Sequence, residues 1–494
     1  MMLKLLRGRK AICAATALSV CISLQAKVTL PSFISDNMVL QQQTEVKLWG
    51  WTDSGKAVKV TTGWDGKSVS ASPDKSGKWM VSVPTPEASL TPWEISFSDG
   101  ESLSIKNVLI GEVWFCSGQS NMDMVVRGYS GQPTEGGVDA ILAANPARPI
   151  RICTIKKNYS TEPVETSEGS WQENDPQTVA KTSATAYFFA DCLQSALGIP
   201  VGILITCRGG STIETWIDRE TIEKGFADEF DLSYLDRPWD PAGKIKGADH
   251  RLPCMLYNGQ VHPLEPFTFK GMIWYQGEAN RTRPEQYLRL MQAYAAMMRE
   301  KFQNPGAPYY FVQIAPYIYS SDGDNTFISG YMYEAQQKAA ETIPNSAMAC
   351  TVDVGAANVI HPPKKREVGR RLAMLALARD YGVNVIDPYS PTFQKVEFAD
   401  GKALVTFKMG TMGLSPMNVD LEGFEVSGAD KVFHPAKARV GKDRKTIRVW
   451  SDEVSEPVAV RYCWRDYAEG TVYNNYGIPV APFRTDDWTL DEVK

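Results

Sequence analysis

The chain has 494 residues, of which 43% are hydrophobic and 22% are charged, and its formal net charge is −5. This composition is that of a packed globular protein and excludes a disordered or fibrous chain, and the length favours two to four domains. Because no dense run of Lys and Arg occurs beyond the N-terminus and the short KKR at 364–366, neither nucleic acid nor an anionic membrane is an expected partner.

The first 26 residues have the order of a secretory signal peptide. Basic residues come first, an apolar stretch follows at 11–24, and the small residue Ala26 comes next. We expect cleavage after Ala26 and a secreted or periplasmic protein. The apolar stretch is shorter than the roughly 20 residues of a spanning helix, and no later segment is apolar enough, so no stable membrane insertion is expected.

The cysteines of the mature chain are odd in number and show no paired spacing, although export would permit disulfides. The pattern therefore predicts buried free thiols rather than a disulfide framework. The residues concerned are Cys116, Cys153, Cys192, Cys207, Cys254, Cys350 and Cys463.

Residues 27–107 are predicted to form a small N-terminal β domain. Short segments of alternating hydrophobicity, separated by turn-rich pieces, are typical of strands. They lie at 46–51, 79–83 and 94–98.

In residues 108–383 apolar strands alternate with helical patterns. This alternation predicts an α/β domain with a parallel sheet that helices cover on both faces, and ligands then bind at the carboxyl ends of the strands. The expected strands are 108–116, 150–155, 200–206, 270–276, 309–315 and 346–352. The expected helices are 183–198, 285–302, 329–343 and 365–382.

Two long polar stretches, 156–182 and 227–253, interrupt this domain, and loops of that length are typically lids or binding loops. From residue 384 the sequence again has the pattern of short strands and turns. Residues 384–494 are therefore predicted to form a C-terminal β domain.

Three phrases that contain residues suited to catalysis follow expected strands. In SGQSN, Ser120 stands at a strand end, where an exposed serine with a nearby base can act as a nucleophile. In CRGGSTIETW, Gly209 and Gly210 allow the backbone to approach a ligand and to direct N–H groups at a developing anion. In WYQGEAN, Asn280 offers a side-chain N–H donor. Taken singly, each phrase also fits an ordinary turn after a strand.

The mature chain contains four histidines, so a general base that works at neutral pH has few candidates. His361 stands between an expected strand and an expected helix, at the carboxyl edge of the sheet. The others are His250, His262 and His434.

Together and in this order, four phrases resemble the SGNH-hydrolase superfamily and, within it, the sialate O-acetylesterase-like family. The closing YNNYGIPVAPFRTDDW at 473–488 is similar to the C-terminal end of that family, so the resemblance spans nearly all of the mature chain. The four phrases are GEVWFCSGQSNM at 111–122, GGSTIETW at 209–216, WYQGEAN at 274–280 and IHPPKKREVGRRLA at 360–373.

The resemblance implies a flavodoxin-like α/β fold flanked by the two β domains, with Ser120 as nucleophile and His361 as base. It also implies an oxyanion hole made by the N–H of Ser120, by Gly209 or Gly210, and by Asn280. Neither a metal nor an organic cofactor is expected for this chemistry.

One position departs from the superfamily pattern, which often has an aspartate three residues before the histidine; here that residue is Asn358. Asp353, eight residues upstream, is the nearest acid on the same strand end. We expect Asp353 or a backbone carbonyl to orient the imidazole of His361, and rank Asn358 last.

The sequence therefore predicts a serine esterase that removes O-acetyl groups from carbohydrate through an acetyl-serine intermediate. O-acetylated sialic acid is the expected substrate, and this choice rests on the resemblance. An esterase of the same fold acting on acetylxylan, another polysaccharide, a lipid or a thioester is an alternative. A carbohydrate-binding protein with an inactive hydrolase core is another. The sequence does not predict the oligomeric state.

Overall fold

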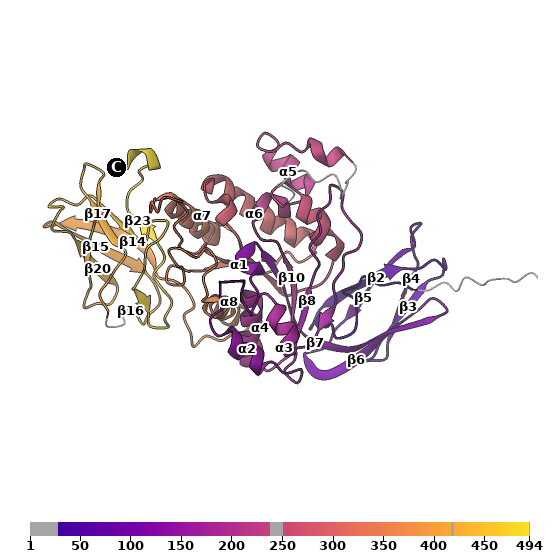
Figure 1. Ribbon diagram of the computed structural model, residues 1–494. Coiled ribbons are helices and arrows are strands. Elements are labelled where there is room, and N and C mark those ends of the chain that lie inside the picture. Colours follow the sequence, from indigo (N-terminus) through magenta and orange to yellow (C-terminus); the bar gives the residue numbers. More distant parts are fainter. Residues whose placement is uncertain (1–27, 238–249, 416–418, 494) are drawn as a thin grey trace, which may run out of the picture.

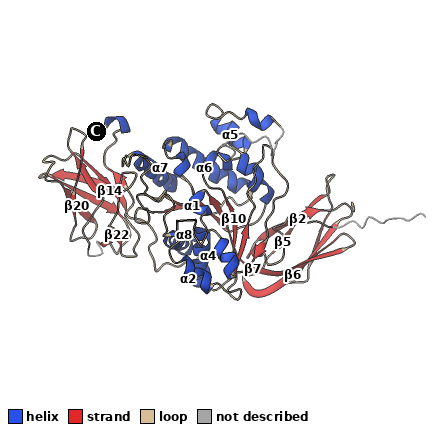
Figure 2. Ribbon diagram, viewed as in Figure 1, coloured by secondary structure: helices blue, strands red, loops and turns tan. Residues whose placement is uncertain are grey.

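The computed structural model describes residues 28–237, 250–415 and 419–493, which form three regions in a row (Figure 1). Strands build both ends, and a mixture of helices and strands builds the middle (Figure 2). The predicted signal peptide and its cleavage site lie outside the described residues, as does the part of the predicted loop 227–253 from 238 to 249.

The middle region contains a sheet in which neighbouring strands are parallel, except for the antiparallel pair at one edge. This confirms the predicted α/β class. The chain adds strands on one side of β7 first and on the other side afterwards, so the strand order reverses at β7. A ligand site is expected at that reversal, at the carboxyl ends of the strands. In spatial order the strands are β13 (Ser346–Ala349), β12 (Tyr309–Val312), β11 (Gly271–Tyr275), β7 (Ser102–Gly118), β10 (Val201–Cys207), β8 (Ile150–Thr154) and β9 (Trp171–Gln172).

Helices cover both faces of this sheet, as predicted. Successive side chains of a strand point to opposite faces. Trp114 of β7 therefore packs with one group of helices, whereas its neighbour Phe115 packs with the other. The first group is α3 (Pro176–Lys181), α4 (Ala184–Leu197) and α8 (Lys365–Asp380). The second is α6 (Pro284–Lys301) and α7 (Ile328–Thr342).

Shorter helices and helical turns lie in the connections between these elements. They are α1 (Ser120–Asp123), α2 (Gly137–Ala143), α5 (Arg219–Phe226), η1 (Ile213–Trp216), η2 (Ser233–Asp236), η3 (Tyr257–Val261), η4 (His262–Leu264), η5 (Glu278–Asn280) and, near the C-terminus, η6 (Leu490–Glu492).

The N-terminal β region shares strand β7 with the central sheet. The first half of β7 pairs with β6, and its second half pairs with β10 and β11. The expected boundary between residues 107 and 108 therefore falls inside one continuous strand. The remaining strands are β1 (Val39–Gln41), β2 (Glu45–Trp51), β3 (Val58–Thr62), β4 (Ser68–Ala71), β5 (Lys78–Pro84) and β6 (Ser89–Ser98).

The C-terminal region consists of two four-stranded antiparallel sheets and one strand pair. The expected boundary between residues 383 and 384 lies between α8 and the first of these strands. The strands are β14 (Thr392–Ala399), β15 (Lys402–Lys408), β16 (Leu414–Ser415), β17 (Phe424–Ser427), β18 (Phe433–Pro435), β19 (Lys437–Val440), β20 (Thr446–Trp450), β21 (Ala459–Tyr462), β22 (Tyr473–Asn474) and β23 (Phe483–Arg484).

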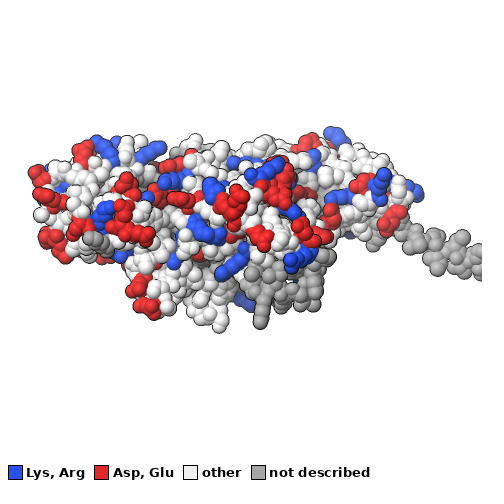
Figure 3. All heavy atoms as spheres, turned by 90° about the horizontal axis from the view of Figure 1, so that it is seen from above, with Lys and Arg blue, Asp and Glu red and all other residues white. Residues whose placement is uncertain are grey.

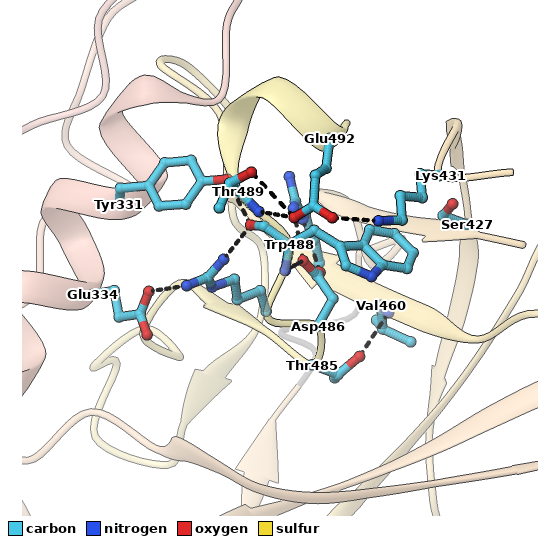
Figure 4. A network of polar contacts seen from close by, with 12 residues as sticks. Tyr331, Glu334, Ser427, Lys431, Val460, Thr485, Asp486, Trp488, Thr489 and Glu492 are labelled. Atoms are coloured by element: carbon cyan, nitrogen blue, oxygen red, sulfur yellow. Dashed lines mark hydrogen bonds and ion pairs between the residues drawn. The ribbon is translucent and has the colours of Figure 1, made fainter. Parts of the chain in front are cut away.

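Strand β23 and the segment after it join this region to the middle one (Figure 4). Arg484 forms an ion pair with Glu334 of α7 at 2.8 Å, and it also donates to the carbonyl of Trp488 at 2.7 Å. The hydroxyl of Tyr331, also on α7, donates to the same carbonyl at 2.9 Å. These contacts fix the C-terminal β region against the helix layer of the central sheet.

The seven cysteines of the described residues are unpaired, and all but the half-buried Cys192 are buried. The prediction of free thiols is thus confirmed for this part of the chain. Among the described residues, no helix combines the length and the apolar character that crossing a membrane requires.

Candidate active site

The nucleophile candidate follows directly from the end of β7. Gly118, the last residue of β7, has φ +149, and a Cβ there would lie 2.2 Å from the carbonyl oxygen of Tyr275 on β11. Only glycine allows the two backbones to approach so closely. Ser120 then begins α1, so its backbone N–H has no acceptor within that helix. Ser120 is half-buried and stands at the carboxyl edge of the sheet, where the topology predicts a site.

Gly209 lies beside this serine, in the turn after β10, and Gly210 follows it. A Cβ placed on Gly209 would be 3.6 Å from the Cβ of Ser120. The Gly209 N–H donates to Oδ2 of Asp123 at 3.3 Å, which is a long bond. Gly210 has φ +74, and its N–H makes no hydrogen bond with any described residue. The structure thus places Gly209 next to Ser120, with its N–H engaged by Asp123, and a Cβ on the following Gly210 would lie near His250.

Asn280 lies in the adjacent turn but is fully buried. Its Nδ2 donates to Oε2 of Glu214 at 2.8 Å, and its Oδ1 accepts from the N–H of Ile213 at 3.0 Å and from Nε2 of Gln276 at 2.7 Å. The side chain therefore ties the GGSTIETW turn to the WYQGEAN turn. An amide nitrogen carries two hydrogens, so one remains for a further acceptor.

The imidazole of His361 is held by a residue that the sequence did not predict. Its Nδ1 lies 2.7 Å from Oε1 of Gln132, and the ring of Tyr129 meets the imidazole edge-on at 5.4 Å between ring centres. Tyr129 and Gln132 close a tight turn through two backbone hydrogen bonds of 2.9 and 3.0 Å. Because an amide oxygen only accepts, Nδ1 carries the proton and Nε2 keeps a free lone pair, which is the form of a general base.

This geometry corrects the expectation for Asp353. Both carboxylate oxygens of Asp353 are engaged by Arg371 of α8, in a fork of two 2.7 Å contacts. The side chain of Arg371 is only 2% exposed, so this is a structural ion pair. Asn358 is exposed. The partner of His361 is therefore neither Asp353 nor a backbone carbonyl, but the side-chain carbonyl of Gln132.

The electrostatic surroundings of His361 favour its neutral form. Burial lowers the pKa of His361, the positive charge of Lys365 lowers it further, and the carboxylate of Asp123 opposes both effects. No hydrogen bond joins the Ser120 hydroxyl to His361, both of which are described residues. Such contacts commonly tighten only when substrate is bound.

The rim of the site carries two cations of different kinds. Lys157 is bound to Asp123 at 2.6 Å. The guanidinium of Arg208 makes no hydrogen bond or ion pair with a described residue, and it lies 5.6 Å from the ring centre of Tyr159. Its charge opposes the rise that burial causes in the pKa of Tyr129, the residue whose ring touches the imidazole. Arg208 is thus an unpaired cation at the edge of the site.

Among the residues that the structure describes, no three His, Cys, Asp or Glu side chains come together as a metal site.

Comparison with known proteins points to one family of carbohydrate esterases. A family model described as "Carbohydrate esterase, sialic acid-specific acetylesterase" matches residues 110–378, which is more than half of the chain. The sialate O-acetylesterases of Mus musculus and Homo sapiens are 24% and 25% identical to this chain; each alignment covers 92% of it, and 93% and 91% of theirs. A carbohydrate acetylesterase from Xanthomonas citri superposes with a TM-score of 0.81 at 32% identity, covering 94% of this chain and 100% of that one.

Proposed function

The chain belongs to the sialic acid-specific acetylesterase family of carbohydrate esterases, and from this we propose that it removes O-acetyl groups from carbohydrate through an acetyl-serine formed on Ser120. One observation carries the proposal. Ser120 lies beside Gly209, and the residue after it, Asn121, donates at 3.2 Å to the carbonyl of Ile360, the residue before His361, whose Nδ1 is held by Gln132. A nucleophile, an oriented base and oxyanion donors are the parts that acyl transfer requires.

In the first half of the reaction Nε2 of His361 takes the hydroxyl proton of Ser120, and Oγ bonds to the acetyl carbonyl carbon. The bond from that carbon to the sugar oxygen then breaks, and His361 returns the proton to the leaving sugar. In the second half water gives a proton to His361 while its oxygen bonds to the acetyl carbon. The bond from that carbon to Oγ then breaks, His361 passes the proton to Oγ, and acetic acid leaves and ionises to acetate.

The negative oxygen of each intermediate needs donors, and we propose the N–H of Ser120, that of Gly209 or Gly210, and the second hydrogen of Asn280 Nδ2. Gly209 lies beside Ser120, and the long bond of its N–H to Asp123 is weak enough to be exchanged for an oxyanion. Donors that are already fixed in place stabilise such charge without reorganisation.

Asn280→Ala is expected to lower kcat by about 10² to 10³ and to leave KM nearly unchanged, because an oxyanion donor acts mainly in the transition state. Steady-state kinetics on a chromogenic acetyl ester would measure this. Since the variant also frees buried groups of Glu214 and Ile213, thermal unfolding must show that it is folded at the assay temperature. A change confined to KM would mean that Asn280 only binds the ground state.

For the substrate we propose O-acetylated sialic acid, and the unpaired Arg208 supports this choice. Sialic acids carry a carboxylate, whereas xylan acetyl groups lie on a neutral backbone chain. Both signs of charge are interspersed over the face seen in Figure 3, so this face offers no broad field of one sign to attract an anion. Recognition of a carboxylate then depends on a local cation, and a guanidinium matches a carboxylate with two parallel hydrogen bonds.

Arg208→Gln is expected to lower kcat/KM for O-acetylated sialic acid by about 10- to 100-fold, since a hydrogen bond to a charged group contributes roughly 1.5 to 3 kcal/mol. The matched control is the methyl ester of the same substrate, which has no carboxylate charge and should change by less than about threefold. Acetate release measures both. Equal losses on the two substrates, or wild-type activity on both, would exclude Arg208 as a carboxylate anchor.

We also infer that the enzyme works outside the cytoplasm. The order of basic, apolar and small residues in the first 26 positions supports export.

A further inference from the structure

A fully buried lysine lies beneath the candidate site. Lys365 is the first residue of α8, four positions after His361, and its exposed fraction is 0%. Its Nζ donates to Oδ1 of Asn121 at 2.6 Å and lies 5.6 Å from the ring centre of Tyr275. A buried ammonium group is costly unless other groups compensate its charge, so its position calls for a reason.

Asn121, the residue after the nucleophile, is where the buried contacts meet. Its Nδ2 donates to Oε1 of Glu278 at 2.6 Å and to the backbone carbonyl of Ile360 at 3.2 Å. The backbone carbonyl of Asn121 accepts from the hydroxyl of Thr185 at 3.2 Å. Asn121 is adjacent to Ser120 and Ile360 is adjacent to His361, so this one side chain connects the nucleophile to the loop that carries the base.

Lys365 and Glu278 hold the Asn121 amide from its two ends. The ammonium binds the amide oxygen, and the carboxylate binds the amide nitrogen, which fixes the orientation of the amide. Hydrogen bonds with an ionised partner are shorter and about twice as strong as those between neutral groups. A neutral amide between two buried ionisable groups is therefore a stiffer link than an amide among neutral partners.

The charge of Lys365 also affects the pKa of His361. Burial lowers the pKa of Lys365 to about 7, an effect that the carboxylate of Glu278 opposes, and burial raises the pKa of Glu278. The other titratable groups facing Glu278 are the buried phenols Tyr275, Tyr287 and Tyr319, and burial raises the pKa of each.

Around His361 itself, the titratable neighbours are Asp123 and Tyr129 in addition to Lys365. The positive charge of Lys365 lowers the pKa of His361, and the negative charge of Asp123 raises it.

We propose that Lys365 and Glu278 are positioning residues of this esterase, which clamp Asn121 between them and so fix the separation of Ser120 Oγ from His361 Nε2. The proposal rests on the function proposed above. It assigns a role to two buried ionisable groups that touch neither the reacting atoms nor the substrate. A displacement of about 1 Å between reacting groups can cost about 10² in rate, so such a clamp has a measurable effect.

The test compares Lys365→Met with Lys364→Met. Lys364 is the exposed neighbour, and its Nζ donates to the backbone carbonyl of Asp353 at 3.1 Å, away from Asn121. For Lys365→Met we expect kcat to fall by about 10- to 100-fold with little change in KM. Lys364→Met should keep the wild-type kcat within about threefold.

The pH profile separates positioning from general structural damage. Removing the charge of Lys365 raises the pKa of His361, so the acidic limb of kcat/KM should move to higher pH in Lys365→Met. Glu278→Gln keeps the shape of the side chain but removes its negative charge. It should lower kcat without moving that limb upward, and Lys364→Met should leave the limb in place.

A folded Lys365→Met with the wild-type kcat and acidic limb would overturn the proposal, as would an equal loss of kcat in Lys364→Met. If Lys365→Met does not fold, a folded Glu278→Gln decides: wild-type kcat overturns the clamp, and a reduced kcat with the acidic limb not raised supports it. The proposed function fails separately, through a Ser120→Ala variant that keeps its activity.

Discussion

Ser120→Ala is expected to lower kcat for an acetyl ester by about 10⁴ or more, because losing the nucleophile of a serine hydrolase removes the covalent route. The stability of the fold should be nearly unchanged. The Ser120 hydroxyl makes no hydrogen bond with any described group, and the side chain is half-buried. Steady-state kinetics and thermal unfolding of the same sample would measure both quantities.

Covalent labelling provides the direct control for this variant. An organophosphonate should label the wild-type protein at Ser120 and should not label Ser120→Ala. The matched substitution is Ser117→Ala in β7, just before the nucleophile, where the hydroxyl is buried and accepts from Thr206 at 3.1 Å. Ser117→Ala should keep its labelling and its kcat within about threefold. Labelling that persists at another serine of Ser120→Ala would show that the nucleophile lies elsewhere.

The sequence predicted the sheet and the edge where the site lies because both depend on local pattern. Apolar runs separated by helical segments produce a parallel sheet, and every strand of such a sheet ends at the same edge. Ser120, Gly209 and Asn280 each follow one of these runs, so the topology alone brings β7, β10 and β11 together. The side-chain partners within that edge do not follow from the strand pattern.

Gln132 shows why those partners could not be predicted. It stands 229 positions before His361 in an irregular loop, and a glutamine in a loop has no distinctive local pattern. Asp353 was the nearest acid on the same strand end, but a salt bridge to Arg371 of α8 engages both of its carboxylate oxygens. Arg371 therefore binds the carboxylate that was expected at His361, and the position of Arg371 depends on how α8 packs against the sheet.

The way in which the N-terminal β region joins the central sheet could not be predicted from the sequence either. The hydrophobic pattern changes near residue 108, and that change was interpreted as a change of domain. In the structure one strand, β7, passes from the first sheet into the second without a break. A change of pairing partner inside a strand leaves no turn residue behind, so no local signal marks it.

His361→Ala is expected to lower kcat by about 10⁴, and what orients this histidine is open to a test with two further variants. A carboxylate that holds the base in one tautomer can be worth about 10⁴ in kcat. Gln132 is neutral, so it fixes the tautomer and orientation without stabilising the imidazolium by its charge. Gln132→Ala should therefore cost only about 10- to 100-fold, the value of one hydrogen bond to a charged group of roughly 1.5 to 3 kcal/mol.

Asp353→Asn should behave differently, because its carboxylate serves Arg371 rather than His361. The buried Arg371 would lose one of its two carboxylate partners and keep Glu367 at 2.9 Å, so the free energy of unfolding should fall by about 1 to 3 kcal/mol. Its kcat, measured well below the unfolding temperature, should stay within about threefold of wild type. Denaturant unfolding and kinetics on Gln132→Ala and Asp353→Asn thus separate the two roles. A folded Asp353→Asn that loses about 10³ or more in kcat, while Gln132→Ala stays active, would show that Asp353 and not Gln132 orients the imidazole, and would contradict this geometry.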